Sequence, residues 1–204
     1  MITLYWNPQS RAERMFWILE EIGQPYQLER MDFRADPPAF TEDFQRASPL
    51  RKVPALRDGE VFLSDSAAIA LYLADRYSMG DLAPAPDAPD RGPYLYWMFF
   101  TPSALEPAMT ERFADIPSMS EAYPWGTFER MVGAFESQLK GREWMASDRF
   151  TMADAMMASS IAYLARFGLY RPVPHVADYL ERCAQRPAFA SGQDRLDAEN
   201  AALK

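Results

Sequence analysis

Residues 53–77, VPALRDGEVFLSDSAAIALYLADRY, contain the pattern that decides the fold. Two short apolar runs, 53–56 and 61–63, flank the dipeptide Asp58-Gly59. This dipeptide favours a hairpin turn because both residues tolerate positive φ. Apolar residues then recur at helical spacing from 65 to 77. The stretch therefore predicts a β-hairpin followed by a helix.

The residues before the hairpin alternate between strand and helix patterns. Residues 2–6, ITLYW, form a strand-like run, and helical spacing follows from Ser10 to Gly23. A second strand-like run covers 26–31, and a weaker helix pattern covers 39–47. The order β-α-β-α-β-β-α predicts an α/β domain of thioredoxin type over residues 1–78.

The rest of the chain reads as helical. Three prolines within 83–89 predict a semi-rigid linker, to which we assign residues 79–90. Residues 91–204 are expected to form an all-α domain, in which Pro102 and Pro107 kink or interrupt the first helix. The predicted helices cover residues 94–113, 125–139, 152–167 and 176–186. The acidic C-terminal stretch is expected to be a solvated tail.

Composition excludes several classes of function. With 21 Lys and Arg against 29 Asp and Glu, the net charge is −8, which disfavours binding to nucleic acids or anionic membranes. The start of the chain lacks the pattern of a signal peptide, and a single cysteine, Cys183, precludes an internal disulfide. These features favour a cytoplasmic location. One histidine, His175, makes a His-based metal centre or a Ser-His-Asp triad improbable.

Three short motifs each have a structural and a functional interpretation. Ser10 precedes a helix whose positive end favours an anion or a thiolate, but serine is also a common helix cap. Pro54 is either an ordinary edge proline or a cis-proline that turns the backbone of Val53 outward. Asp65 and Ser66 either cap the next helix or bind the ammonium and carboxylate groups of a ligand.

Taken together, these motifs resemble the cytosolic glutathione transferase family, and the bacterial members in particular. The resemblance covers nearly the whole chain. It rests on LYWNPQSRAERMFWILEEIGQPY (4–26), KVPAL (52–56), SDSAAIALYLADRY (64–77), YLYWMFF (94–100), FTMADAMMASSIAYLARFG (150–168) and HVADYLERCAQRPAF (175–189). It implies a thioredoxin-like glutathione-binding domain, an all-helical domain and a homodimer.

The resemblance also implies a set of glutathione contacts. The backbone of Val53, next to the expected cis-proline Pro54, is implied to pair with the cysteinyl part of glutathione. Asp65 and Ser66 are implied to hold the γ-glutamyl end, and Lys52 the glycyl carboxylate. Because glutathione is an anion and the protein is acidic, we expect local cations at the site. The candidates are Arg11, Arg14, Arg51 and Lys52.

The residue that activates the glutathione thiol has three candidates. Ser10 occupies the turn where serine-type and cysteine-type members keep their hydroxyl or thiol, and its hydroxyl would stabilise a thiolate by donating a hydrogen bond. Tyr5 matches the tyrosine of mammalian-type members, and Asn7 matches an amide that some bacterial members use. Backbone N–H groups or Arg11 alone remain further possibilities.

The sequence departs from the family pattern in two ways. Arg51 stands where many relatives have glycine. The active-site turn contains no cysteine, so a mixed disulfide with glutathione cannot form there, and this disfavours the cysteine-type reductase activities. Cys183 is expected to be an inert, packed thiol. Reduction of glutathione disulfide by two bound glutathione molecules remains compatible with the sequence.

A pocket for the second substrate is implied on the first helix of the second domain, with a wall from a later helix. Its candidate residues are Asn7, Ser103, Glu106, Met109, Thr110, Phe113 and Tyr163. The aromatic cluster Tyr94, Trp97, Phe99 and Phe100 is expected to be core or a dimer contact. Thr151 and Asp154 have the spacing of a capping box and are assigned to folding, while His175 is expected at a surface helix start.

The sequence therefore predicts a glutathione transferase that conjugates the glutathione thiolate to hydrophobic electrophiles and that needs no metal. The alternatives are a glutathione-dependent peroxidase or disulfide reductase, and a non-catalytic scaffold or binding protein of the same fold.

Overall fold

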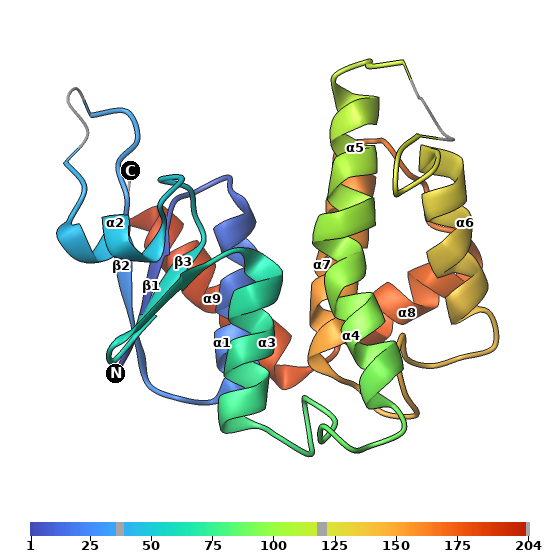
Figure 1. Ribbon diagram of the computed structural model, residues 1–204, viewed down its shortest axis with the longest axis horizontal. Helices are drawn as coiled ribbons and strands as arrows, with labels where there is room; N and C mark the ends of the chain where they lie inside the picture. Colours follow the sequence, from blue (N-terminus) through green and yellow to red (C-terminus); the bar gives the residue numbers. More distant parts are fainter. Residues whose placement is uncertain (36–38, 118–121, 203–204) are drawn as a thin grey trace. The chain divides into compact units, whose positions relative to one another are not determined.

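The computed structural model describes residues 1–35, 39–117 and 122–202, which form two compact units. The N-terminal unit contains Met1–Tyr77 together with the described residues from Arg186 onward. The helical unit contains Ser78–Gln185. Figure 1 colours the chain from blue at its start to red at its end, so the red helix α9 marks the return of the chain to the N-terminal unit.

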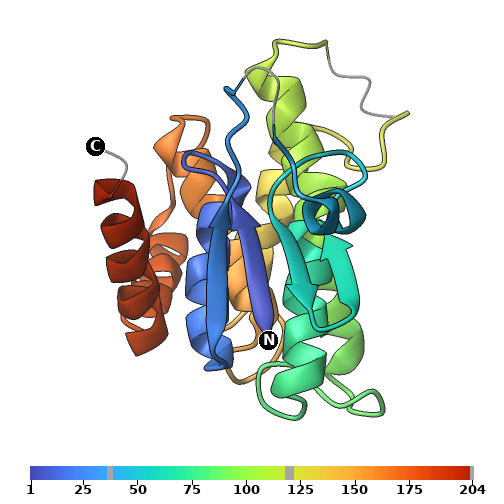
Figure 2. The ribbon, with the colours of Figure 1, turned by 90° about the vertical axis from the view of Figure 1, so that its left-hand side faces the viewer.

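A four-stranded mixed sheet forms the centre of the N-terminal unit (Figure 2). Strand β1 (Ile2–Trp6) lies parallel to β2 (Tyr26–Arg30) and antiparallel to β3 (Ala55–Asp58), which pairs antiparallel with β4 (Val61–Ser64). The strand order is β2-β1-β3-β4. Together with the helices between the strands, this confirms the order predicted from the sequence and the thioredoxin-like fold.

Helices cover both faces of this sheet. The short 3-10 turn η1 (Arg11–Glu13) leads into α1 (Arg14–Ile22), and Phe16 of α1 meets the ring of Trp6 edge-on, with centroids 5.0 Å apart. Helix α3 (Ser66–Tyr77) packs beside α1. Because side chains alternate along a strand, Tyr5 faces the opposite side, where its ring lies 5.5 Å from Phe44 of α2 (Glu42–Ala47).

Helix α9 (Pro187–Ala201) corrects the expectation of a solvated C-terminal tail, because it packs along α1. Gly192 makes the close approach possible, since a Cβ atom there would lie 2.7 Å from the backbone nitrogen of Trp17. The indole of Trp17 also meets the ring of Phe189 edge-on, at 5.1 Å. The sequence assigned residues 91–204 to the helical domain, but these contacts group α9 with the N-terminal unit.

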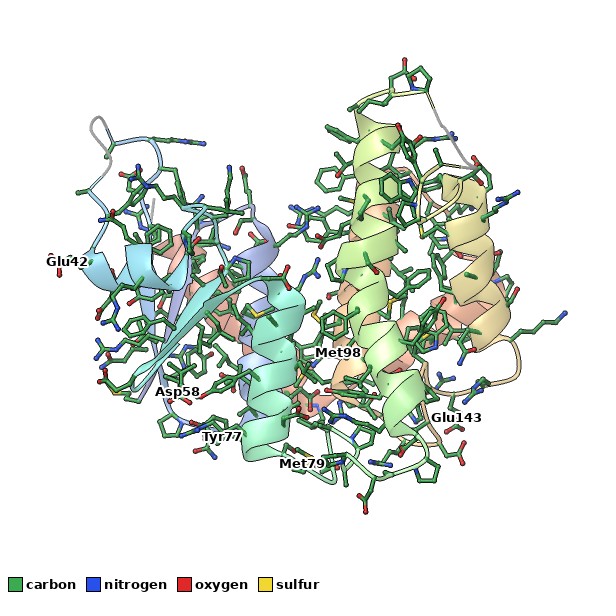
Figure 3. The ribbon with its side chains drawn as sticks, viewed as in Figure 1. Glu42, Asp58, Tyr77, Met79, Met98 and Glu143 are labelled. Carbon is green, nitrogen blue, oxygen red and sulfur yellow. The ribbon has the colours of Figure 1, made fainter. Side chains whose placement is uncertain are left out.

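A buried carboxylate fixes α3 to the hairpin. Asp58, at the end of β3, accepts hydrogen bonds on Oδ2 from the hydroxyls of Tyr72 (2.9 Å) and Tyr77 (2.5 Å). Arg76 lies 3.2 Å from the same oxygen. Figure 3 labels Asp58 and Tyr77, which lie near each other in the N-terminal unit. Burial and the hydrogen bond to Asp58 raise the pKa of Tyr72 to about 12, so the phenol stays a donor at neutral pH.

The first helices of the helical unit form a long segment that contains a π-helical turn. Helix α4 (Arg91–Phe100) continues through η2 (Thr101–Leu105) into α5 (Glu106–Phe113). Pro102 and Pro107 lie in and just after this turn, which confirms the predicted interruption because proline cannot donate a backbone hydrogen bond. The remaining helices of the unit are α6 (Phe128–Leu139), α7 (Met152–Arg166) and α8 (Pro174–Ala184).

The proline-rich segment that the sequence assigned to a linker belongs to the helical unit. Leu82 and Ala83 are buried, and the Leu82 carbonyl accepts a hydrogen bond from the backbone N–H of Met152 at 2.8 Å. The guanidinium of Arg149 donates to the carbonyls of Gly80 and Asp81. The segment therefore packs as part of the unit that it precedes, although its prolines suggested a separate linker.

The capping box predicted at the start of α7 is present. Asp154 Oδ2 accepts from the backbone N–H of Thr151 at 2.8 Å, and Asp154 Oδ1 accepts from the backbone N–H of Met145 at 2.7 Å. Both Thr151 and Asp154 are fully buried. The box therefore orders the segment before α7, in agreement with the role in folding that the sequence indicated.

Candidate functional site

One edge of the sheet brings together the three motifs that the sequence singled out. The strand register pairs Tyr5 with Ala55, and Ala55 with Ser64, so these residues form one row across β1, β3 and β4. The turn after β1, the loop before β3 and the start of α3 all continue from this row. The candidate residues for glutathione binding from these three segments therefore meet at the same edge of the N-terminal unit.

Ser10 caps the helical turn that follows β1. Its Oγ accepts from the backbone N–H of Ala12 at 3.2 Å and donates to the carbonyl of Asn7 at 2.6 Å. Gln9, at a φ of 59°, directs its own N–H to Glu13 Oε1 at 2.7 Å. The capping interpretation is thus confirmed. Donation of the Ser10 proton to a thiolate would require it to leave the Asn7 carbonyl.

Tyr5 lies in the core of the N-terminal unit. Its side chain is 1% exposed and packs in a cluster with Met31, Phe44, Ala47 and Ala55. Burial, reinforced by the nearby carboxylates of Glu29 and Asp43, raises the pKa of Tyr5 to about 12. A buried phenol with a raised pKa gives up its proton reluctantly, although it can still donate a hydrogen bond.

Asn7 follows β1 directly and is half-buried. Its side-chain amide donates to the carbonyl of Pro8 at 3.1 Å. Asn7 therefore stabilises the same turn that Ser10 caps, in two ways: through its amide and through its own carbonyl, which accepts the Ser10 proton. The two candidates are coupled by this contact.

The peptide bond between Val53 and Pro54 is cis, which decides between the two interpretations of this proline. Pro54 is buried and Val53 is half-buried. Lys52, immediately before them, has an exposed side chain, as expected for a residue that binds a carboxylate. Arg51 has a φ of 53°, a left-handed conformation that favours glycine and that explains why glycine suits this position.

Asp65 and Ser66 open α3. Asp65 has a φ of 79°, and its Oδ1 accepts from the backbone N–H groups of Ala67 (2.9 Å) and Ala68 (3.1 Å). Ser66 is buried. The capping role is confirmed for Asp65, and the same geometry holds its carboxylate at the positive end of a helix of 12 residues.

The remaining candidate cations of the N-terminal unit differ in exposure. Arg11 is half-buried in η1, whereas Arg14 is buried in α1. Arg51 and Lys52 are both exposed on the loop before β3. The side chains with access to solvent are therefore those of Arg11, Arg51 and Lys52, and the buried Arg14 fits the expectation of a ligand contact less well.

Six candidate residues for the second substrate belong to the helical unit, whereas Asn7 belongs to the N-terminal unit. Ser103 lines a cavity of about 510 Å³ between α4, η2 and α6, with Tyr96, Phe99 and Trp125 among its walls. Phe113 is 69% exposed, and its ring lies 6.0 Å from that of Phe167. Phe113 is not among the residues that line the cavity beside Ser103.

Phe167 is a residue that the sequence reasoning missed. Its ring also lies 5.5 Å from that of Tyr163, so it joins the two predicted residues Phe113 and Tyr163 into one exposed aromatic surface. The spacing of four residues between Tyr163 and Phe167 is the signal that would have found it. Thr110 and Ser103 instead donate their hydroxyls to carbonyls of their own helical segment, those of Glu106 and Phe99.

The other residues singled out from the sequence have structural roles. Tyr94, Trp97 and Phe100 are buried, as expected for core, while Phe99 is partly exposed. Cys183 is buried, as expected. His175 is half-buried, and its Nε2 lies 2.9 Å from the carbonyl of Glu136, so it ties α8 to α6. The expectation of a surface histidine is therefore only partly right.

The structure describes residues 1–35, 39–117 and 122–202. Within these ranges, the side chains of His, Cys, Asp and Glu form no group of three or more that could hold a metal ion. Within them also, each helix is too short or too polar to span a bilayer.

Comparisons with known proteins show the family to which the chain belongs. The family model of the glutathione S-transferase N-terminal domain matches residues 10–76, and that of the C-terminal domain matches residues 126–187. Glutathione S-transferase 2 of Anopheles gambiae is 30% identical over 188 residues, which cover 86% of this chain and 87% of the relative. The chain belongs to the glutathione S-transferase family.

Two further relatives show the breadth of this family. The disulfide-bond oxidoreductase YfcG of Escherichia coli is 28% identical and covers 98% of this chain, which in turn covers 96% of that protein. The structure of a sphingomonad glutathione S-transferase in complex with glutathione is 27% identical, with a TM-score of 0.77, 95% of this chain covered and 98% of the other. The enzyme class and the fold expected from the sequence are thereby confirmed.

Proposed function

We propose that this protein binds glutathione at the sheet edge formed by Tyr5, Ala55 and Ser64, and that it conjugates the glutathione thiolate to hydrophobic electrophiles. The single observation that carries the proposal is the register of β1, β3 and β4, which brings the Ser10 turn, the Val53-Pro54 loop and the Asp65-Ser66 helix start together. The complex of the sphingomonad relative with glutathione supports the same ligand.

The proposed binding mode assigns one part of glutathione to each segment. The backbone of Val53 pairs with the cysteinyl part. Asp65 and Ser66 hold the γ-glutamyl ammonium and carboxylate, where the helix N-terminus favours the negative charge. Lys52 and Arg11 provide positive charge for the remaining, glycyl carboxylate of glutathione. An acidic protein must supply such positive charge locally.

In the proposed reaction, Ser10 exchanges its hydrogen bond to the Asn7 carbonyl for one to the glutathione sulfur. This bond stabilises the thiolate and lowers the pKa of the thiol, so the thiol proton is lost to water while Ser10 keeps its own proton. The thiolate then attacks an electrophilic carbon of the second substrate. A carbon–sulfur bond forms, and the leaving group departs with its electron pair. Tyr5 and Asn7 remain the alternatives for the activating role.

The second substrate is expected to contact side chains of the helical unit, namely Ser103, Glu106, Met109, Thr110, Phe113 and Tyr163. Asn7 of the N-terminal unit is a further proposed contact. Exposed aromatic side chains and methionine suit apolar ligands of varied shape. The partly exposed Tyr96 and Phe99 of α4 also support a homodimer through this helix. We further propose a cytoplasmic location, where the buried thiol of Cys183 stays reduced.

A reductase is the second candidate, because one relative is a disulfide-bond oxidoreductase. Without a cysteine in the Ser10 turn, such a reaction would need two glutathione molecules. The first thiolate attacks a disulfide or a peroxide, which releases a thiolate or an alkoxide and leaves a mixed disulfide or a sulfenic acid on the first glutathione. The second thiolate attacks the sulfur of that first glutathione, and the second thiolate of the disulfide, or hydroxide, leaves. Glutathione disulfide forms, and its two thiols have supplied the two electrons.

Calorimetric titration with glutathione tests the proposal. Assays of transfer to a chloronitrobenzene, of reduction of an organic hydroperoxide and of disulfide exchange then separate the activities. Glutathione binding at millimolar concentration or below, together with conjugation, is expected. If glutathione does not bind, both enzymatic functions are rejected and a scaffold function is favoured.

A further inference from the structure

We propose that Ser48 is a positioning residue that aims the backbone N–H of Val53 at the ligand. Ser48 follows α2 and is 1% exposed. Its Oγ donates to the carbonyl of Lys52 and accepts from the backbone N–H of Lys52, both at 2.8 Å. One buried hydroxyl therefore holds both backbone groups of the residue before Val53. The inference rests on the proposed function, because it concerns the donor that pairs with glutathione.

The peptide plane explains how this contact acts on Val53. The carbonyl of Lys52 and the N–H of Val53 belong to the same planar peptide group, in which the two bonds point in opposite directions when the peptide is trans. The cis bond is the next one along the chain, between Val53 and Pro54. Because Ser48 holds the Lys52 carbonyl toward the protein, the Val53 N–H is turned to the opposite side.

Ser48 also closes the loop through its own backbone. Its N–H donates to the carbonyl of Phe44 and its carbonyl accepts from the N–H of Arg51, both at 2.8 Å. Arg51 keeps a left-handed φ of 53°, a conformation that a non-glycine residue holds only when its surroundings impose it. The Ser48 hydroxyl is thus one of the contacts that keep this loop in a single conformation, while Leu50 at its tip is 83% exposed.

The helical unit offers a matched control. Ser147 is 8% exposed, and its Oγ donates to the carbonyl of Arg149 (2.9 Å) and accepts from the N–H of Arg149 (3.3 Å). The pattern is that of Ser48 and Lys52, but it belongs to the helical unit and not to the segments that form the sheet edge. Ser147→Ala therefore removes a similar pair of bonds without touching the loop before β3.

The experiment compares Ser48→Ala, Ser48→Cys, Ser48→Thr and Ser147→Ala in the full chain. We expect Ser48→Ala to weaken glutathione binding, measured by calorimetry, roughly tenfold, since it removes both hydrogen bonds that hold the backbone of Lys52. The KM for glutathione rises, whereas the KM for the electrophile stays close to that of the unsubstituted protein. If Ser48→Ala does not fold, Ser48→Cys takes its place, because it keeps the size of the side chain but weakens the hydrogen-bond donor. We expect it to weaken glutathione binding less than Ser48→Ala would. Ser48→Thr retains the hydroxyl and restores binding.

Other outcomes overturn the proposal. Unchanged glutathione affinity in Ser48→Ala, or an equal loss in Ser147→Ala, shows that Ser48 has no specific role in positioning. An unsubstituted protein that does not bind glutathione rejects the proposed function instead. In that case, the chemical shift of the Val53 amide in NMR spectra decides the positioning role. If Ser48 sets that peptide plane, the signal moves in Ser48→Ala and stays in place in Ser147→Ala.

Discussion

Arg186 and Glu21 form a bidentate ion pair, with Nε 2.6 Å from Oε1 and Nη2 2.7 Å from Oε2. The Glu21 side chain is 4% exposed and also accepts a hydrogen bond from the indole of Trp17 at 2.8 Å. The pair joins α1 to the residue immediately before α9. It therefore stabilises the packing of the last described helix on the first.

Removing this pair is expected to destabilise the N-terminal unit. Arg186→Ala leaves the buried carboxylate of Glu21 without its charge partner, which should lower the free energy of unfolding by about 3 kcal/mol. Urea unfolding followed by circular dichroism measures the change. The control is Arg112→Ala, whose ion pair with Glu129 is exposed on both sides and should contribute below about 1 kcal/mol. Equal losses in the two variants would contradict the assigned role.

Glycine at position 192 is expected to be essential for the packing of α9 on α1. Gly192→Ala places a methyl group about 2.7 Å from the Trp17 backbone nitrogen, which must move. The overpacking should cost about 1–3 kcal/mol of unfolding free energy. Gly133→Ala in α6 is the matched control, because a Cβ there meets nothing within 4 Å and should stabilise the helix by about 0.5–1 kcal/mol. Thermal unfolding of both variants tests the opposite signs.

Helix α9 also shows why part of the fold could not be predicted from the sequence. Its contacts with α1 include Gly192, the ring of Phe189, and polar contacts of Ser191 and Arg195 with Glu20, so the stripe of large apolar residues that identifies an amphipathic helix is weak. The sheet and α3 were predictable because hairpin and helix patterns are local. The close approach of Gly192 to the backbone of Trp17, far away in the sequence, leaves no such local pattern.

The candidate site also has residues that local motifs identify and residues that only the fold brings together. Ser10, Pro54 and Asp65 were found because each belongs to a short motif with a recognisable order. The tie between Ser48 and Lys52 joins a side chain to the backbone four residues on, which gives no periodic signal. The contact of Phe167 with Phe113 could not be predicted, because Phe113 lies on another helix and only the fold brings the two rings together. The spacing of four residues between Phe167 and Tyr163, in contrast, is a local signal.

The pKa of the bound glutathione thiol distinguishes Ser10 from Tyr5. Loss of a hydrogen bond to a thiolate in Ser10→Ala should raise this pKa by about 1 unit, since bonds to charged groups contribute about 1.5–3 kcal/mol. Burial holds the pKa of Tyr5 near 12, so its phenol does not ionise in the range of the assay. Titration of the thiolate absorbance measures the shift. If the pKa of the bound thiol rises more in Tyr5→Phe than in Ser10→Ala, then Tyr5 and not Ser10 activates the thiol.

Asp154 predicts a dependence of stability on pH. Burial raises its pKa from the ordinary 3.8 to about 6, although four hydrogen bonds oppose the rise. The folded state thus binds the proton more tightly than the unfolded state. The contribution of Asp154 protonation to the free energy of unfolding is therefore complete below pH 3.8, and it is lost as the pH rises through 6.

The comparison with Asp154→Asn isolates this contribution. The unfolding free energy of the unsubstituted protein minus that of Asp154→Asn should fall by about 2–3 kcal/mol between pH 4 and pH 7, at about 1.4 kcal/mol per pKa unit. Urea unfolding at several pH values provides both quantities. A difference that rises with pH would mean that the hydrogen bonds to the carboxylate outweigh its burial.

The return of α9 to the N-terminal unit has a consequence for synthesis on the ribosome. The first 77 residues emerge early, but the helix that covers α1 lies beyond Ser78–Gln185. At about 5–20 residues per second, roughly 5–20 s pass before this helix follows. During that interval the nascent sheet and its three helices expose the apolar side of α1 around Trp17, which makes it a surface that a chaperone can recognise.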